Sequence, residues 1–86
     1  MKVYQILNVS STLGENFIIP DAFVYRFYQD AMENLEKRMA YFEDNKENCS
    51  YKGKINSIEE IQNQIYTECI TSYDHTDFYI YEMEVI

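Results

Sequence analysis

A long helical repeat in the middle of the chain sets the strongest limit on the fold. Between positions 24 and 42, apolar side chains recur at steps of three and four residues, the spacing of one face of an α-helix: Val24, Phe27, Tyr28, Ala31, Leu35, Met39 and Phe42. Asp21 precedes this repeat and is a suitable N-cap. We therefore predict a helix from Asp21 to about Asp44, about 36 Å long at 1.5 Å per residue.

The segments on either side of this repeat favour β-strand. Residues 2–9 alternate so that Val3, Leu7 and Val9 share one face, and residues 17–19 form a second short strand that ends at Pro20. Residues 78–86 carry the clearest strand pattern of the chain. The segment from Asn45 to Gly53 is rich in Asn, Lys and Gly, which predicts a loop.

A second helix is predicted to begin at Ser57. Ser57-Ile58-Glu59-Glu60 has the form of a capping box, and an inward stripe follows: Ile58, Ile61, Ile65 and Cys69. Beyond Ile65 two readings stay open, since residues 66–71 are also β-branched enough for a strand. One is a helix to about Ser72, which we favour, and the other is a shorter helix followed by a hairpin. Residues 73–77 are predicted to be a turn before the last strand.

This order of elements predicts a single α+β domain over residues 1–86. We expect two helices on one face of a small antiparallel or mixed sheet, with the N- and C-terminal strands as neighbours.

Several kinds of catalytic or cofactor site are excluded by the residues present. Neither Gly14 nor Gly53 has a second glycine at the distance that a nucleotide-binding loop needs, and two cysteines, Cys49 and Cys69, do not make a structural zinc module. His75 is the only histidine, and we predict an exposed turn residue rather than a metal ligand or the base of a cysteine nucleophile. We therefore expect a protein without enzymatic activity, metal or cofactor.

The net charge limits the choice of partner. The formal charge is −8 and the sequence pI is about 4.4, which argues against nucleic acid or an anionic membrane as a direct ligand. The longest wholly apolar runs have three residues, and the first five residues lack a signal-peptide core. Two cysteines are few for a secreted domain of this size, so we expect reduced thiols and a cytoplasmic protein.

The charge is distributed unevenly along the chain. Residues 57–86 hold seven acids and no Lys or Arg, whereas residues 1–56 hold eight acids and all seven basic residues. On the long helix, Arg26 with Asp30 and Glu33 with Lys37 are i,i+4 pairs, which predicts a charge-balanced, solvated face. Further acids at its C-terminal end oppose the helix dipole, and we expect Arg38 and Lys46 to compensate them.

The acidic last third suggests a protein-binding surface. We predict a non-enzymatic inhibitor whose carboxylates stand in for phosphates in the basic groove of a nuclease or another nucleic-acid-binding protein. The predicted contact residues are acids and tyrosine anchors: Glu59, Glu60, Glu68, Asp74, Asp77, Glu82, Glu84, Tyr66, Tyr73, Tyr79 and Tyr81. The simpler explanation is that the acids only keep a small domain soluble.

Composition adds an indication of origin. Residue types with A/T-rich codons (Phe, Tyr, Met, Ile, Asn and Lys) make up 40 of the 86 residues. In size, acidity and composition the chain resembles the accessory inhibitors that phages use against host defences, including anti-CRISPR proteins, which implies action in the host cytoplasm. No motif carries this resemblance, so it implies no site residues.

Two alternatives remain open. One is a self-associating structural or adaptor module, such as a homodimer, that pairs through an uncovered edge of the Tyr-rich terminal strand. The other is an antitoxin or immunity protein that neutralises a basic toxin.

Overall fold

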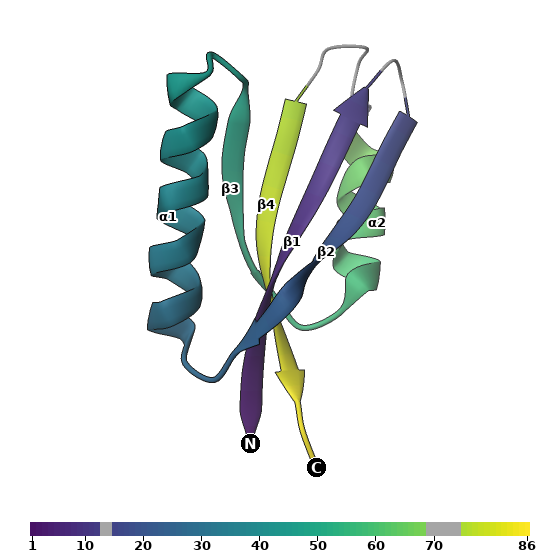
Figure 1. Ribbon diagram of the computed structural model, residues 1–86. Helices are drawn as coiled ribbons and strands as arrows, with labels where there is room; N and C mark the ends of the chain where they lie inside the picture. Colours follow the sequence, from purple (N-terminus) through teal and green to yellow (C-terminus); the bar gives the residue numbers. More distant parts are fainter. Residues whose placement is uncertain (13–14, 69–74) are drawn as a thin grey trace.

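The chain folds into a four-stranded mixed sheet with two helices, as the computed structural model shows for residues 1–12, 15–68 and 75–86, the part of the chain that it describes (Figure 1). The elements are β1 (Lys2–Thr12), β2 (Glu15–Tyr25), α1 (Tyr28–Asp44), β3 (Cys49–Ile55), α2 (Ile58–Glu68) and β4 (His75–Glu84). The predicted α+β class is confirmed.

The two terminal strands form the centre of the sheet, whose strand order is β2-β1-β4-β3. β1 pairs antiparallel with β4 from Lys2↔Glu84 to Ser11↔His75, so the N- and C-terminal strands are neighbours, and Figure 1 shows both chain ends at the same end of the sheet. β3 pairs parallel with β4. β4 therefore lies inside the sheet, and the idea that this strand offers an uncovered edge for self-association is wrong.

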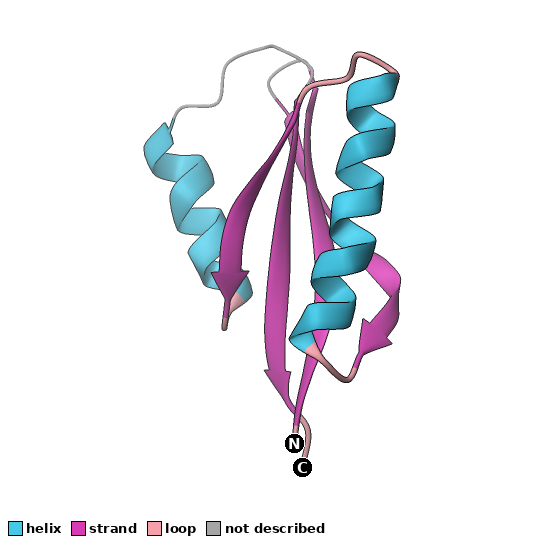
Figure 2. Cartoon of the chain, turned by 90° about the vertical axis from the view of Figure 1, so that its left-hand side faces the viewer, coloured by secondary structure: helices cyan, strands magenta, loops and turns pink. Residues whose placement is uncertain are grey.

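The helices lie on opposite faces of the sheet, which corrects the expectation that both cover one face (Figure 2). One core cluster joins α1 to the sheet: Ile6, Ala31, Leu35, Phe78 and Ile80. The second lies on the other face with α2: Leu7, Val9, Ile55, Ile61 and Tyr79. Consecutive residues of one strand point to opposite faces, so the buried run from Phe78 to Ile80 needs a cover on both sides.

Strand β2 occupies residues that the helical repeat assigns to a helix. The predicted helix start at Asp21 is wrong, because β2 continues past Pro20 and pairs Val24 with Gln5 and Tyr25 with Tyr4. Pro20 is tolerated because β2 is an edge strand, and the pairing register shifts between Gln5 and Leu7, next to it. Aromatic and β-branched residues dominate this segment and favour the strand.

Strand β3 occupies the second half of the segment predicted to be a loop. Cys49 and Tyr51 pack against the core cluster under α1, which stabilises a strand despite its Lys and Gly content. Gly53 has φ 126° and lies where the pairing with β4 shifts register, so this backbone conformation requires glycine. The loop prediction is wrong from Cys49 onward.

Helix α2 begins as predicted. The Ser57 hydroxyl accepts a hydrogen bond from the Glu59 amide (3.1 Å), and the Glu60 carboxylate accepts one from the Ser57 amide (3.2 Å). Residues 66–68 belong to this helix, which removes the strand alternative for them, whereas residues 69–74 lie outside the described part. No described helix has the length and apolar character needed to cross a membrane.

Candidate functional site

The acid and the histidine at the start of β4 belong to the interior. Asp77 is 4% exposed, and its Oδ1 lies 2.7 Å from Nε2 of His75. His75 is half-buried in a strand, so the prediction of an exposed turn histidine is wrong. Asp77 is likewise not available to a partner, which corrects its assignment to the contact surface. A buried carboxylate requires such a partner, because desolvation of an unpaired charge is costly.

Glu82 is neutralised by lysines from the first part of the chain. Its side chain is 11% exposed and lies 3.2 Å from Nζ of Lys54 on β3 and 3.3 Å from Nζ of Lys2 on β1. The Tyr4 hydroxyl also donates to it, at 3.4 Å. The hydrogen bond from Lys54, aided by Lys2, lowers the pKa of Glu82 below its ordinary value and outweighs the opposing effect of desolvation. Glu82 therefore links three strands of the sheet.

Glu84 lies beside the same cluster, in contact with the chain start. It is exposed, and its Oε1 lies 3.5 Å from the N-terminal amine of Met1. Together with Lys2, Asn56 and Glu82 it lines an open pocket of about 240 Å³. This pocket combines both signs of charge, since Lys2 lies in it beside Glu82 and Glu84, so it does not form a one-signed surface.

The other predicted contact residues are scattered or buried. Glu59 and Glu60 are exposed in the first turn of α2, where the Glu60 carboxylate is engaged in the capping box. Tyr79 is 2% exposed and belongs to the core, so its assignment as a surface anchor is wrong, and Tyr81 is half-buried against the same cluster. Of the remaining four, Tyr66 and Glu68 lie in α2 without a described side chain, and Tyr73 and Asp74 lie outside the described residues.

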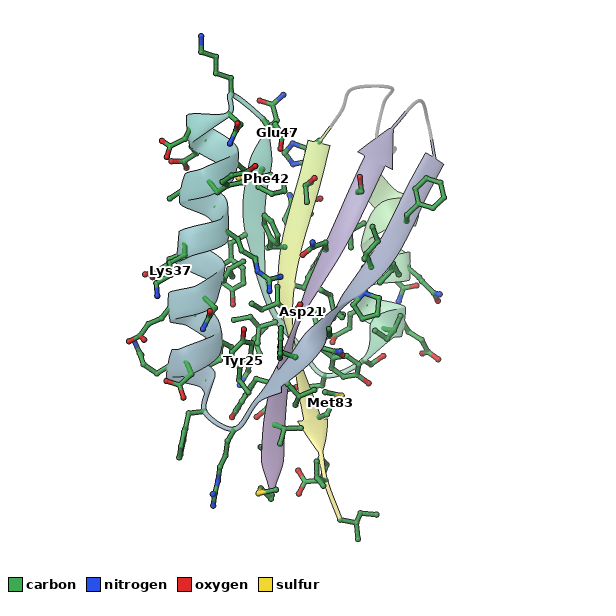
Figure 3. The ribbon with its side chains drawn as sticks, in the orientation of Figure 1. Asp21, Tyr25, Lys37, Phe42, Glu47 and Met83 are labelled. Atoms are coloured by element: carbon green, nitrogen blue, oxygen red, sulfur yellow. The ribbon has the colours of Figure 1, made fainter. Side chains whose placement is uncertain are left out.

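A more concentrated acidic surface lies on the outward face of α1. It comprises the exposed acids that point away from the buried Ala31 and Leu35: Asp30, Glu33, Glu36, Glu43 and Asp44. Lys37 is on the side of α1 away from the sheet, whereas Phe42 points toward the sheet (Figure 3). None of these five carboxylates has an ion-pair partner within 4.0 Å in the described part of the chain.

Two of the basic residues expected to balance the charge of α1, Arg26 and Arg38, lie elsewhere, whereas Lys37 stays on the outward face. Because α1 begins at Tyr28, Arg26 is outside the helix, and its guanidinium lies over the Phe27 ring at 5.8 Å. Arg38 turns toward the sheet and forms an ion pair with Asp21 of β2. The prediction of a charge-balanced face is therefore wrong. The signal that could have revealed this is the strand preference of residues 21–27, which moves the helix start.

The C-terminal end of α1 concentrates negative charge further. Its last turn has no basic residue, and Glu43, Asp44 and Glu47 lie where the helix dipole is already negative. The pKa of the Cys49 thiol on β3 is raised, first by burial and then by the charges of Glu43 and Glu47. The negative potential of this end therefore reaches the neighbouring strand.

The described residues contain no group of three or more His, Cys, Asp and Glu placed to hold a metal ion. Comparison with protein-family models, with curated protein sequences and with solved structures finds no significant match to this chain. The outward face of α1 is therefore judged by its geometry and charge alone.

Proposed function

We propose that the protein is a non-enzymatic inhibitor that binds the basic groove of a nucleic-acid-handling protein, with the outward face of α1 as its main contact surface. The observation that carries this proposal is the run of five exposed acids between Asp30 and Asp44, which share the outward face with one lysine, Lys37, because Arg38 is paired with Asp21. The run is about 21 Å long at 1.5 Å per residue. That is about 5 Å per net charge, of the same order as the 3.4 Å between phosphates along one nucleic-acid strand.

The placement of these acids supports a role outside folding. The outward face of α1 contributes no ion pair to the described fold, and the acids at the C-terminal end of the helix oppose its dipole. A complementary basic groove supplies the missing positive charge, speeds association and excludes the nucleic acid that would otherwise bind there.

The class of target follows from the same chemistry. The target we propose is a nuclease of a bacterial defence system, the kind of target that phage anti-CRISPR proteins inhibit. This choice is based on the small size, the acidity and the composition of the chain. An antitoxin or immunity protein would use the same acidic face against a basic toxin. Identification of the captured protein separates these two targets.

The experiment compares two variants that remove the same amount of charge from different surfaces. Glu33→Gln/Glu36→Gln alters α1, and Glu59→Gln/Glu84→Gln alters exposed acids of α2 and β4. Each immobilised protein captures basic proteins from a host lysate that has been depleted of nucleic acid. The captured protein is then tested for DNA binding with each variant added.

We expect the wild-type chain and the α2/β4 variant to displace DNA from the captured protein, and the α1 variant to be about tenfold weaker. Displacement should fade by about 0.5 M salt, where screening is strong. Equal displacement by both variants contradicts the assignment of the α1 face. A loss confined to the α2/β4 variant would restore the surface predicted from the sequence, and failure to displace DNA at all would reject nucleic-acid mimicry.

A further inference from the structure

The outer edge of β2 is an exposed apolar surface of a different kind. β2 is an edge strand of 11 residues, so its backbone on the side away from β1 faces no neighbouring strand in the described sheet. Its exposed apolar side chains, with one that follows the strand, are Phe17 (50%), Ile19 (52%), Phe23 (67%), Val24 (51%) and Phe27 (61%). Isolated exposed apolar residues are ordinary, but five along one edge strand, on both of its faces, indicate an interaction site.

This edge carries few charged side chains: β2 has two acids, Glu15 and Asp21, and Arg26 follows the strand. Between Phe17 and Phe27 the chain carries one acid and one base, Asp21 and Arg26, and Asp21 is already paired with Arg38. Two copies of a chain with a formal charge of −8 repel each other over most of their surface. Between Phe17 and Phe27 they can approach along β2 without bringing unpaired carboxylates of that stretch together.

We infer that the β2 edge binds the β2 edge of a second copy of this chain and forms a two-fold symmetric dimer with a continuous eight-stranded sheet. A two-fold axis makes the two strands antiparallel, and each edge then contacts an identical one. Pairing about the middle of β2 brings the end of each strand that carries Phe17 toward the end of the other that carries Phe23, so aromatic side chains of the two copies face each other. Pro20, which has no N–H, then lies close to the axis.

The available area is sufficient for a specific dimer. Aromatic side chains present about 150–250 Å² each, so the exposed fractions above give on the order of 500 Å² of apolar surface per copy. Two copies would bury about 1,000 Å² of apolar area, the lower limit for a specific interface, and the paired backbones add to it. Aromatic residues and few charges are also typical of interface cores.

The dimer is independent of the proposed inhibitor function, although the two are compatible. In Figure 1 β2 starts far from α1 and its end runs down to the first turn of that helix, whereas the acids of the outward face of α1 point away from the buried Ala31 and Leu35, so pairing along β2 leaves that face accessible. Dimerisation and partner binding also respond to salt in opposite ways. Salt screens repulsion between two acidic copies and so favours the dimer, whereas it weakens attraction to a basic partner.

The test is sedimentation equilibrium of the full chain from micromolar to millimolar concentration, in low and high salt. The edge variant is Phe17→Lys/Ile19→Lys, which alters two half-exposed side chains, and the control is Tyr41→Lys on α1, 64% exposed. Circular dichroism and thermal unfolding report whether each variant is folded. A second edge variant, Phe23→Lys, is used in place of any that is not.

We expect a wild-type particle of twice the chain mass, whose dissociation constant does not rise with salt. The edge variant should dissociate at least about tenfold more readily, the effect of a buried unpaired charge at an interface. The control should match the wild type. A wild-type chain that stays monomeric throughout overturns the inference, as does a dimer that the folded edge variant retains or that the control disrupts as much as the edge variant does.

Discussion

The acids of β4 and the acids of α1 are the same residue types in very different surroundings. On β4, Asp77 is 4% exposed and the side chain of Glu82 is 11% exposed. Each has a lysine or histidine partner within 3.3 Å. The five acids on the outward face of α1 are exposed and have no ion-pair partner in the described residues. The acids of β4 therefore stabilise the fold, whereas the acids of α1 are available to a partner.

This difference shows why a count of charge along the chain does not locate a charged surface. The last thirty residues are the most acidic in sequence, but Lys2 and Lys54 come from distant strands to neutralise Glu82. Helix α1 has a more balanced composition, but its Arg38 is paired with Asp21 of β2. The outward face of α1 is therefore the more negative surface.

Removing the hydrogen-bond partner of the buried acid Asp77 should have the largest effect. His75→Ala leaves the carboxylate of Asp77 without its hydrogen-bond partner, and we expect a loss of about 1–3 kcal/mol in the free energy of unfolding. The matched change on α1 is Lys37→Ala, which should stay within about 0.5 kcal/mol of the wild type. Urea unfolding monitored by circular dichroism measures both. Equal effects of the two substitutions would contradict the contrast.

Glu82 should stabilise the fold in a pH-dependent way. Its pKa is lowered in the folded protein, so its contribution is fully present above the ordinary value of 4.5 and is lost as the pH falls through the lower folded-state pKa. Glu82→Gln should therefore lower the urea midpoint at neutral pH, and its difference from wild type should shrink toward zero in acid. The matched variant Glu36→Gln should leave the midpoint unchanged. A Glu82→Gln difference that grows in acid would refute this assignment.

Neutralising the C-terminal end of α1 should stabilise the protein. Glu43→Gln/Asp44→Asn removes two negative charges from the negative end of the helix dipole, and we expect a gain of about 0.3–1 kcal/mol in unfolding free energy. Glu59→Gln is the mirror-image control, because Glu59 lies in the first turn of α2, where a negative charge is favourable. Its midpoint should fall slightly. A loss of stability in the α1 variant would show that the fold requires these acids.

The smallest expected effect is on the Cys49 thiol. Glu43 and Glu47 raise its pKa, so Glu43→Gln/Glu47→Gln should lower that pKa toward its ordinary value without reaching it, since burial is the larger cause. The rate of alkylation against pH, measured with Cys69→Ser in both proteins, reports the change. An unchanged profile would mean that the negative potential of α1 does not extend to β3.

Local sequence patterns were sufficient for the elements that depend on local interactions. The capping box at Ser57 and the inward positions Ala31 and Leu35 of α1 follow from hydrogen bonds and spacing within a few residues. The same local spacing misleads at Val24 and Phe27, which fit a helical repeat but are exposed in the structure. There the pairing of β2 with β1 decides the conformation.

The surfaces were harder to predict because they depend on contacts between distant residues. β3 is stabilised by its parallel pairing with β4, and no local pattern in its Lys- and Gly-rich sequence indicates that partner. The burial of Asp77 and the pairing of Glu82 with Lys2 follow from strand order. One local signal was present: the consecutive apolar and aromatic residues from Phe78 to Ile80 are typical of a strand whose two faces are both covered.

The most direct measurement of the central claim is the association rate with a captured basic partner as a function of ionic strength. It compares the wild-type chain, Glu33→Gln/Glu36→Gln on α1 and Glu82→Gln on β4. If the outward face of α1 steers association, the α1 variant binds about tenfold more slowly at low salt and depends less on salt, whereas the β4 variant follows the wild type. An α1 variant that associates as fast as the wild type, with the same salt dependence, would contradict the account.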